Sequence, residues 1–151
     1  AIKNHITTDQ VLDLYAGVGT IGLSVARDRD LTLVEIDGSA YRELEKNCAP
    51  ASKSNKTIRP VLARSEEALN YITPAHTVIL DPPRAGCAPA LLEELLSTLP
   101  PTIIYLSCNP STQARDLKYL TETNKYEIVK VQPYNFFPRT PHIENLIVLN
   151  L

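Results

Sequence analysis

"QVLDLYAGVGTIG", residues 10–22, runs from an apolar strand pattern through a glycine-rich turn into the start of a helix. Gly17 and Gly19 let the backbone bend tightly and approach a ligand, and the N–H groups at the start of the following helix are free to bind one. With Gly22 they meet the Gly-x-Gly-x-x-Gly pattern, so the spacing alone leaves a pyrophosphate cofactor open. An ordinary strand–helix turn without a ligand is the plain alternative.

The rest of the chain repeats this alternation of strands and helices. Strands are predicted at 10–15, 31–37, 57–63, 76–81, 102–107, 126–134 and 144–151. Helices are predicted at 20–28, 38–49, 65–72, 89–99 and 111–122. Such alternation is typical of an α/β fold with a mainly parallel sheet and helices on both faces, and Pro60 favours an edge position for the third strand. The last two strands have no helix between them, which predicts an antiparallel strand at one side.

Composition restricts the class of protein. The chain has 151 residues, 44% of them hydrophobic, and a net charge of −2, which fits about one globular domain and does not by itself indicate a nucleic-acid binder. No apolar run approaches about 20 residues and no signal peptide is recognisable, so a soluble, cytoplasmic protein is expected. Three widely spaced cysteines fit neither a disulfide framework nor a metal site, and Cys48 fits a buried helix position. The sequence carries no signal for an oligomeric state.

Polar side chains gather at the predicted strand ends. Asp13, Glu35, Asp81 and Cys108 each end or follow a strand, and ligands of open α/β sheets bind at the carboxyl ends of the strands. Asp13, before the turn, suits a ligand ammonium group and suits a diphosphate poorly. Glu35, about 20 residues after the glycines, can accept hydrogen bonds from ribose hydroxyls, whereas Asp37 fits a helix cap. A site with partners for an ammonium group and for a ribose suits an amino acid joined to a nucleoside, and this indicates S-adenosylmethionine.

The segment "DPPRAG", residues 81–86, follows the fourth predicted strand. Two prolines fix the turn, so Asp81 is held where a cofactor or a substrate base can meet it. Arg84 is a candidate for a phosphate contact. The alternative is that the prolines only end the strand, with Asp81 as a turn cap.

Cys108 leaves the fifth predicted strand in the sequence "SCNP". The Asn109–Pro110 pair forces an extended turn that fixes the direction of the thiol. The helix that follows, with Ser111 as its expected cap, favours a thiolate through the partial positive charge at its start. Cys87, beside the Pro-Pro turn, is the rival nucleophile but has no evident activation.

The last loop, residues 134–145, is dense in aromatic residues and prolines. Tyr134, Phe136 and Phe137 are candidates for stacking on an unpaired base, and Arg139 for a phosphate contact, although core packing also explains a phenylalanine. Glu144 begins the last strand, where a solvated glutamate is the plain alternative. For His142, a hydrogen-bonded loop position and a catalytic role are both open.

Taken together, "DLYAGVGTIGL", "VEID", "ILDPPRAG", "YLSCNPSTQARDL" and "FFPRTPHIE" resemble the family of S-adenosylmethionine-dependent RNA uracil-C5 methyltransferases. The resemblance covers nearly the whole chain in family order. It implies a Rossmann-like class I methyltransferase fold, S-adenosyl-L-methionine as cofactor, and tRNA or rRNA as partner. No metal and no membrane are expected.

The resemblance also implies roles for individual residues. Cys108 matches the nucleophile that adds to C6 of the uracil, and Glu144 matches the general base that removes the C5 proton. Asp81 matches a residue near both cofactor and base. The expected cofactor-binding set is Asp13, Tyr15, Gly17, Gly19, Thr20, Glu35 and Asp81. The expected substrate-binding set is Asp81, Arg84, Asn109, Pro110, Phe137 and His142.

In this family the catalytic domain normally follows an RNA-binding β-barrel and a central domain. Neither segment, nor a glutamine motif before the first strand, is recognisable here, so residues 1–151 are expected to be a catalytic-domain fragment. Two other functions stay open. One is a cofactor-binding RNA-interaction module without turnover, and the other is an NAD-dependent oxidoreductase based on the glycine spacing.

Overall fold

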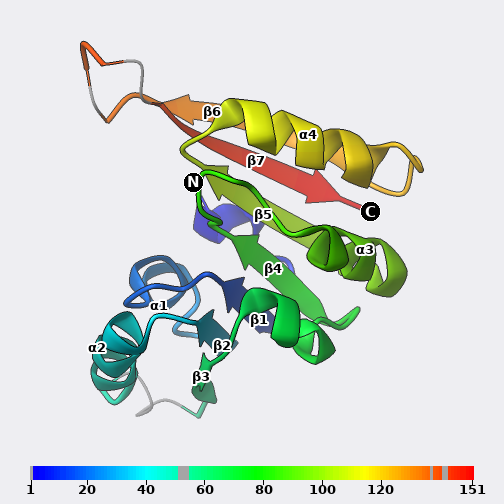
Figure 1. The fold of residues 1–151 in the computed structure, drawn as a ribbon. Helices are drawn as coiled ribbons and strands as arrows, with labels where there is room; N and C mark the ends of the chain where they lie inside the picture. Colours follow the sequence, from blue (N-terminus) through cyan, green and yellow to red (C-terminus); the bar gives the residue numbers. More distant parts are fainter. Residues whose placement is uncertain (1, 51–54, 137, 141–142) are drawn as a thin grey trace.

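One sheet of seven strands, in the order β3-β2-β1-β4-β5-β7-β6, forms the centre of the protein (Figure 1). The structure, a computed structural model, describes residues 2–50, 55–136, 138–140 and 143–151. The strands are β1 (Gln10–Leu14), β2 (Asp30–Glu35), β3 (Ile58–Leu62), β4 (His76–Leu80), β5 (Thr102–Ser107), β6 (Glu127–Tyr134) and β7 (Glu144–Asn150). The strands β1 to β5 pair in parallel, and β7 is antiparallel to both of its neighbours. This confirms the predicted fold class.

Helices cover both faces of the sheet (Figure 1). They are the α-helices α1 (Thr20–Val25), α2 (Gly38–Cys48), α3 (Pro89–Thr98) and α4 (Pro110–Thr121), and the 3-10 helices η1 (Ile2–His5), η3 (Ser65–Glu67) and η4 (Leu69–Tyr71). Leu44 of α2 packs in one buried cluster with Leu33 of β2. Leu95 of α3 packs in a second cluster with Leu80 of β4, on the opposite face. Side chains of a strand point alternately to the two faces of the sheet, and helices cover both faces, so both sets of side chains are buried.

Two local predictions have different outcomes. Pro60 lies in β3, which is an edge strand, as predicted, since proline has no N–H to donate to a second neighbour. The single helix predicted at 65–72 is wrong, because η3 and η4 are separate 3-10 turns with bonds such as Ile72 N–H to Leu69 O (2.9 Å). Pro74 stops the segment before it reaches the length that a cooperative α-helix needs.

Among the described residues, none of the helices combines the length and the apolarity needed to cross a lipid bilayer.

Candidate active site

The turn between β1 and α1 has an unusual backbone conformation. Tyr15, Gly17 and Gly19 have positive φ angles of 67°, 56° and 86°. A Cβ atom on Gly19 would lie 2.7 Å from Leu44 Cδ1, so only glycine lets the turn pack against α2. Gly17 has open space where a side chain would stand, and its N–H donates to Glu35 Oε2 (2.7 Å). At Gly17 a ligand can therefore approach bare backbone.

Glu35 ends β2 and binds the glycine turn. Its Oε2 accepts from Gly17 N–H, and its Oε1 accepts from Asp37 N–H (2.7 Å). Asp37 has the capping role that the sequence left open for it, because its Oδ1 accepts from the N–H groups of Ser39 and Ala40. Each Glu35 oxygen has a second lone pair, so Glu35 can still accept hydrogen bonds from a ligand such as a ribose.

Asp13 is buried within β1 beneath α1. Its Oδ2 accepts from Gly22 N–H (2.9 Å), and a Cβ atom on Gly22 would lie 2.6 Å from that oxygen. Its Oδ1 has no hydrogen-bond partner in the described part of the chain. Burial raises the pKa of Asp13 to about 7, the hydrogen bond from Gly22 opposes this rise, and the charges of Asp81 and Glu35 add to it. A cationic ligand group that reached Oδ1 would supply the donor that it lacks.

The raised pKa of Asp13 should make the stability of the folded protein depend on pH. Its pKa rises from 3.8 to about 7, so the folded protein holds a proton that the unfolded chain releases, and the free energy of unfolding falls as pH rises through this window. Asp13→Asn cannot ionise. The free energy of unfolding of the variant, minus that of the wild type, should therefore grow by about 3 kcal/mol between about pH 4.5 and pH 8. Urea unfolding at both pH values measures this difference, and a constant difference would show that Asp13 ionises normally.

A cavity of about 550 Å³ lies at the carboxyl ends of β4 and β5. It is lined by Asp81, the first residue after β4, by Cys108, the first after β5, and by Glu144, the first of β7. Tyr134 and Phe136 add an aromatic wall, with ring centroids 5.5 Å apart and ring planes inclined by 2°. The fold thus brings the three residues predicted for the chemistry into one cavity of a size typical for small ligands.

Two carboxylates share this cavity. Asp81 is an exposed residue, but partial burial of its carboxyl group raises its pKa to about 6, and the charge of Glu144 adds to the rise. Close to this pH Asp81 can donate as well as accept a hydrogen bond. In the described part of the chain, no group of three or more His, Cys, Asp or Glu side chains is arranged to hold a metal ion.

The turn after β5 fixes the place of Cys108. Ser107 Oγ accepts from Asn109 N–H (3.0 Å), and Pro110 occupies the first turn of α4. The prediction of Ser111 as the cap is wrong, because Asn109 caps the helix by accepting Ser111 N–H at its Oδ1 (3.2 Å). The proline keeps Asn109 extended, the conformation that a cap requires. The start of α4 therefore lies directly after Cys108.

Exposure separates Cys108 from the other cysteines. Cys48 and Cys87 are each 3% exposed, whereas Cys108 is partly exposed. Burial raises the pKa of Cys87 to about 12, so this thiol stays protonated near neutral pH. Cys87 is therefore a structural residue and not the rival nucleophile that the sequence left open.

The other predicted site residues lie elsewhere or outside the described residues. Thr20 lines a separate cavity of about 230 Å³ together with Asn47 of α2. Arg84 is exposed in the loop after β4. Phe137 and His142 lie outside the described residues, so the structure does not test the predictions for them.

Asp116 is a buried polar residue that the sequence analysis missed. It lies in the middle of α4 and accepts hydrogen bonds from Cys87 N–H (2.8 Å) and Tyr105 OH (2.7 Å). The available signal was helical spacing, since Gln113, Asp116 and Leu120 share the buried face of α4. A charged residue on such a face needs partners, and Asp116 has them in the loop after β4 and in β5.

Comparison with protein families gives a specific match. Residues 68–151 match the family described as tRNA (Uracil-5-)-methyltransferase. An uncharacterized RNA methyltransferase of Listeria innocua is 40% identical over 149 residues, which cover 95% of this chain and 32% of the relative. One from Thermosynechococcus vestitus is 37% identical over 143 residues, which cover 93% of this chain and 31% of the relative. The chain thus spans about a third of the length of the curated relatives it matches.

Solved structures agree with this match. The crystal structure of Pyrococcus abyssi tRNA (uracil-54, C5)-methyltransferase in complex with S-adenosyl-L-homocysteine is 32% identical, with a TM-score of 0.84, and the match covers 98% of this chain and 36% of that one. A precorrin-6y C5,15-methyltransferase from Geobacter metallireducens has a TM-score of 0.72 at 13% identity, over 94% of this chain and 80% of that one, which shows a shared fold alone. These similarities confirm the predicted Rossmann-like class I methyltransferase fold.

Proposed function

Because the chain belongs to the tRNA (uracil-5-)-methyltransferase family, we propose that it transfers a methyl group from S-adenosylmethionine to C5 of a uridine in tRNA or rRNA. The observation that carries this proposal is the cavity that holds Cys108, Asp81 and Glu144 together. The reaction needs a nucleophile to activate the uracil and a base to remove a proton, and a thiol with two carboxylates can supply both.

Cys108 is the nucleophile in this proposal. Its thiolate adds to C6 of the uracil, and the electrons of the C5–C6 double bond move towards C5 and the C4 carbonyl oxygen to give an enolate. S-adenosylmethionine, when bound, supplies the electrophilic methyl group. The addition divides one difficult step into easier ones, because C5 of an isolated uracil is a poor nucleophile. The target base has to leave its stack to reach the thiol.

Glu144 is the general base. After methylation, C5 carries both the methyl group and its original hydrogen, so the ring regains its double bond only when that proton leaves. The Glu144 carboxylate takes the proton, the electrons of the C5–H bond form the C5–C6 double bond, and the C6–S bond breaks to return Cys108 as a thiolate. Asp81 lines the same cavity, which supports a role for it in hydrogen-bonding the base or the cofactor.

The glycine turn supports S-adenosylmethionine as the cofactor. The unpartnered Oδ1 of Asp13 can accept a bond from its amino group, and Glu35 can accept bonds from its ribose hydroxyls. We assign cofactor binding to Asp13, Tyr15, Gly17, Gly19, Thr20, Glu35 and Asp81. We assign contacts with the RNA to Asp81, Arg84, Asn109, Pro110, Phe137 and His142.

A mechanism-based trap tests the proposed function. The protein is incubated with S-adenosylmethionine and a short single-stranded RNA that contains 5-fluorouridine, and the products are separated by denaturing electrophoresis. Fluorine at C5 cannot leave as a proton does, so we expect a stable adduct of protein, RNA and one methyl group.

Binding measurements separate the alternatives if no adduct forms. S-adenosylmethionine binding by calorimetry without an adduct would refute methyl transfer and leave a cofactor-binding RNA-interaction module. Binding of NAD in place of S-adenosylmethionine would support the oxidoreductase that the glycine spacing allows.

A further inference from the structure

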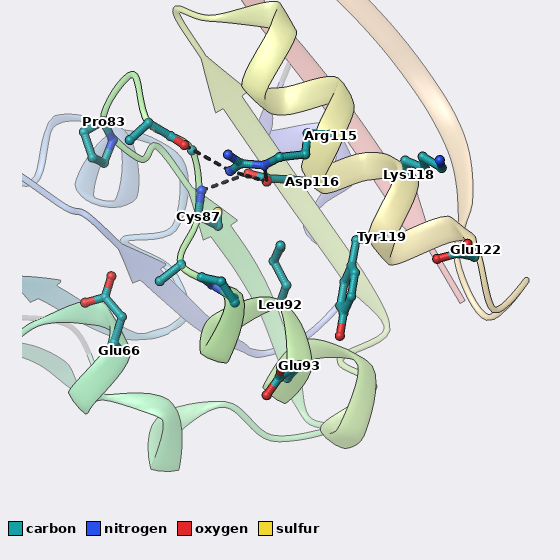
Figure 2. Close-up of a pocket in the computed structure, with 14 residues that line it drawn as sticks. Glu66, Pro83, Cys87, Leu92, Glu93, Arg115, Asp116, Lys118, Tyr119 and Glu122 are labelled. Atoms are coloured by element: carbon teal, nitrogen blue, oxygen red, sulfur yellow. Dashed lines mark hydrogen bonds and ion pairs between the residues drawn. The ribbon is translucent and has the colours of Figure 1, made fainter.

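We propose that Asp116 is a positioning residue that locks the loop carrying Asp81 to the helix that follows Cys108. This inference rests on the proposed function, because it concerns how two residues of that site are held relative to each other. Asp116 is fully buried, and it lines a second cavity of about 820 Å³ between the loop after β4, α3 and α4 (Figure 2). This cavity is distinct from the one that holds Cys108.

Asp116 joins three parts of the fold. Its Oδ2 accepts from Cys87 N–H (2.8 Å) in the loop after β4 and from Tyr105 OH (2.7 Å) in β5. Its Oδ1 accepts from Arg115 Nε (2.9 Å) and Nη2 (2.7 Å), as Figure 2 shows for the guanidinium group. A buried carboxylate is tolerated only when it is paired and hydrogen-bonded, and here the partners come from the elements that have to be held together.

The same loop is bound to α4 at two further points. Arg84 O accepts from Asn109 Nδ2 (2.9 Å) and from Thr112 Oγ1 (3.0 Å). Ala85 O accepts from Arg115 Nη2 (3.0 Å). Successive carbonyl groups of the loop are therefore bonded to the start and the second turn of α4. Asp116 adds a further, buried bond between the loop and the helix.

Gly86 shows how closely the loop approaches the helix. Its φ is 82°, and a Cβ atom there would lie 2.6 Å from Asp116 Oδ2 and 2.7 Å from Arg115 Nη2. Any other residue would push the loop away from α4. Gly86 and Asp116 therefore form one contact. It needs a residue without a side chain in the loop and a hydrogen-bond acceptor in the helix.

Rigid segments connect this contact to the catalytic cavity. Pro82 and Pro83 lie between Asp81 and the bonded part of the loop, and Pro110 lies between Cys108 and the bonded part of α4. Fixing the loop to α4 therefore fixes Asp81 relative to Cys108. Without the contact, only the bonds of Arg84 O and Ala85 O would hold the loop to α4, and a misplacement of about 1 Å can lower a rate about 100-fold.

Asp116→Asn tests the positioning role. The amide keeps the shape of the side chain, but its N–H₂ group is a donor and cannot accept a hydrogen bond from the groups that donate to the carboxylate. We expect kcat for methyl transfer to fall about 10- to 100-fold while KM for S-adenosylmethionine changes less than about 2-fold. Glu122→Gln is the matched control, because it neutralises an exposed acidic residue at the end of α4 that lines the same cavity and leaves every bond of Asp116 in place. An equal loss of kcat in both variants at equal melting temperature would overturn the proposal.

Alkylation of Cys108 tests the contact independently of methylation. The other two cysteines are buried, so iodoacetamide should modify Cys108 in the folded protein, and peptide mass spectrometry gives the rate. We expect Asp116→Asn and Gly86→Ala to change this rate severalfold and Glu122→Gln to leave it unchanged. A wild type that forms no 5-fluorouridine adduct would refute the proposed function. Unchanged alkylation rates in Asp116→Asn and Gly86→Ala would refute the positioning role.

Discussion

Replacing Cys108 with alanine is expected to abolish methyl transfer while the protein still binds S-adenosylmethionine. Without the thiol, no nucleophile adds to C6, C5 stays unreactive, and the rate should fall by at least about 10⁴-fold. Cofactor affinity should persist because Asp13 and Glu35 lie on β1 and β2 and do not depend on the thiol. Single-turnover transfer from labelled S-adenosylmethionine measures the first effect, and calorimetry measures the second.

Cys48→Ala is the matched control for the Cys108 variant. It removes the same thiol from a buried position on α2, so a small loss of stability and full methyl transfer are expected. Methyl transfer that survives in Cys108→Ala at a rate close to that of this control would rule out Cys108 as the nucleophile.

The sheet is largely predictable from the sequence because both of its faces are buried. Successive residues of β1 face opposite clusters, with Leu12 in one and Val11 in the other, so the strand is apolar apart from Gln10 and Asp13. The order of the strands is not predictable in this way. Leu14 pairs with Leu80 across 65 intervening residues, and no local pattern encodes such a contact.

The cavity that holds Asp81, Cys108 and Glu144 is predictable because strand ends meet at one edge of a parallel sheet. Asp81 and Cys108 follow β4 and β5, and Glu144 begins β7, which runs antiparallel and therefore starts where β5 ends. Asp13 is different. It lies one residue before the end of β1, and its side chain is buried and bonded to Gly22 of α1.

Asp116 could not be predicted from helical spacing alone. An acidic residue within a helix usually faces water, and the helix pattern does not reveal which loop will cross it. The loop after β4 crosses α4 only because β4 and β5 pair side by side, which is a long-range feature. Gly86 is the local sign of that crossing, since a Cβ atom at this position of positive φ would lie too close to Asp116.

Glu144→Gln is expected to trap the enzyme after methyl transfer. Cys108 can still add to C6 and C5 can still take the methyl group, but the amide cannot accept the C5 proton. Release of Cys108 should then slow by about 10²- to 10⁴-fold, and a covalent protein–RNA adduct should accumulate even with ordinary uridine. Denaturing electrophoresis detects the adduct, and mass spectrometry should find one methyl group on it.

Glu127→Gln is the matched control for this variant, because it neutralises an exposed glutamate at the start of β6, at the opposite end of that strand from the cavity-lining Tyr134. It should release the methylated RNA at the wild-type rate. Removal of the Glu144 charge should also lower the pKa of Asp81, although burial, the larger cause of its rise, remains. An adduct in Glu144→Gln would therefore assign proton removal to Glu144 and not to Asp81. Release at the wild-type rate would instead assign it to another group, and His142→Asn would be the next variant to compare.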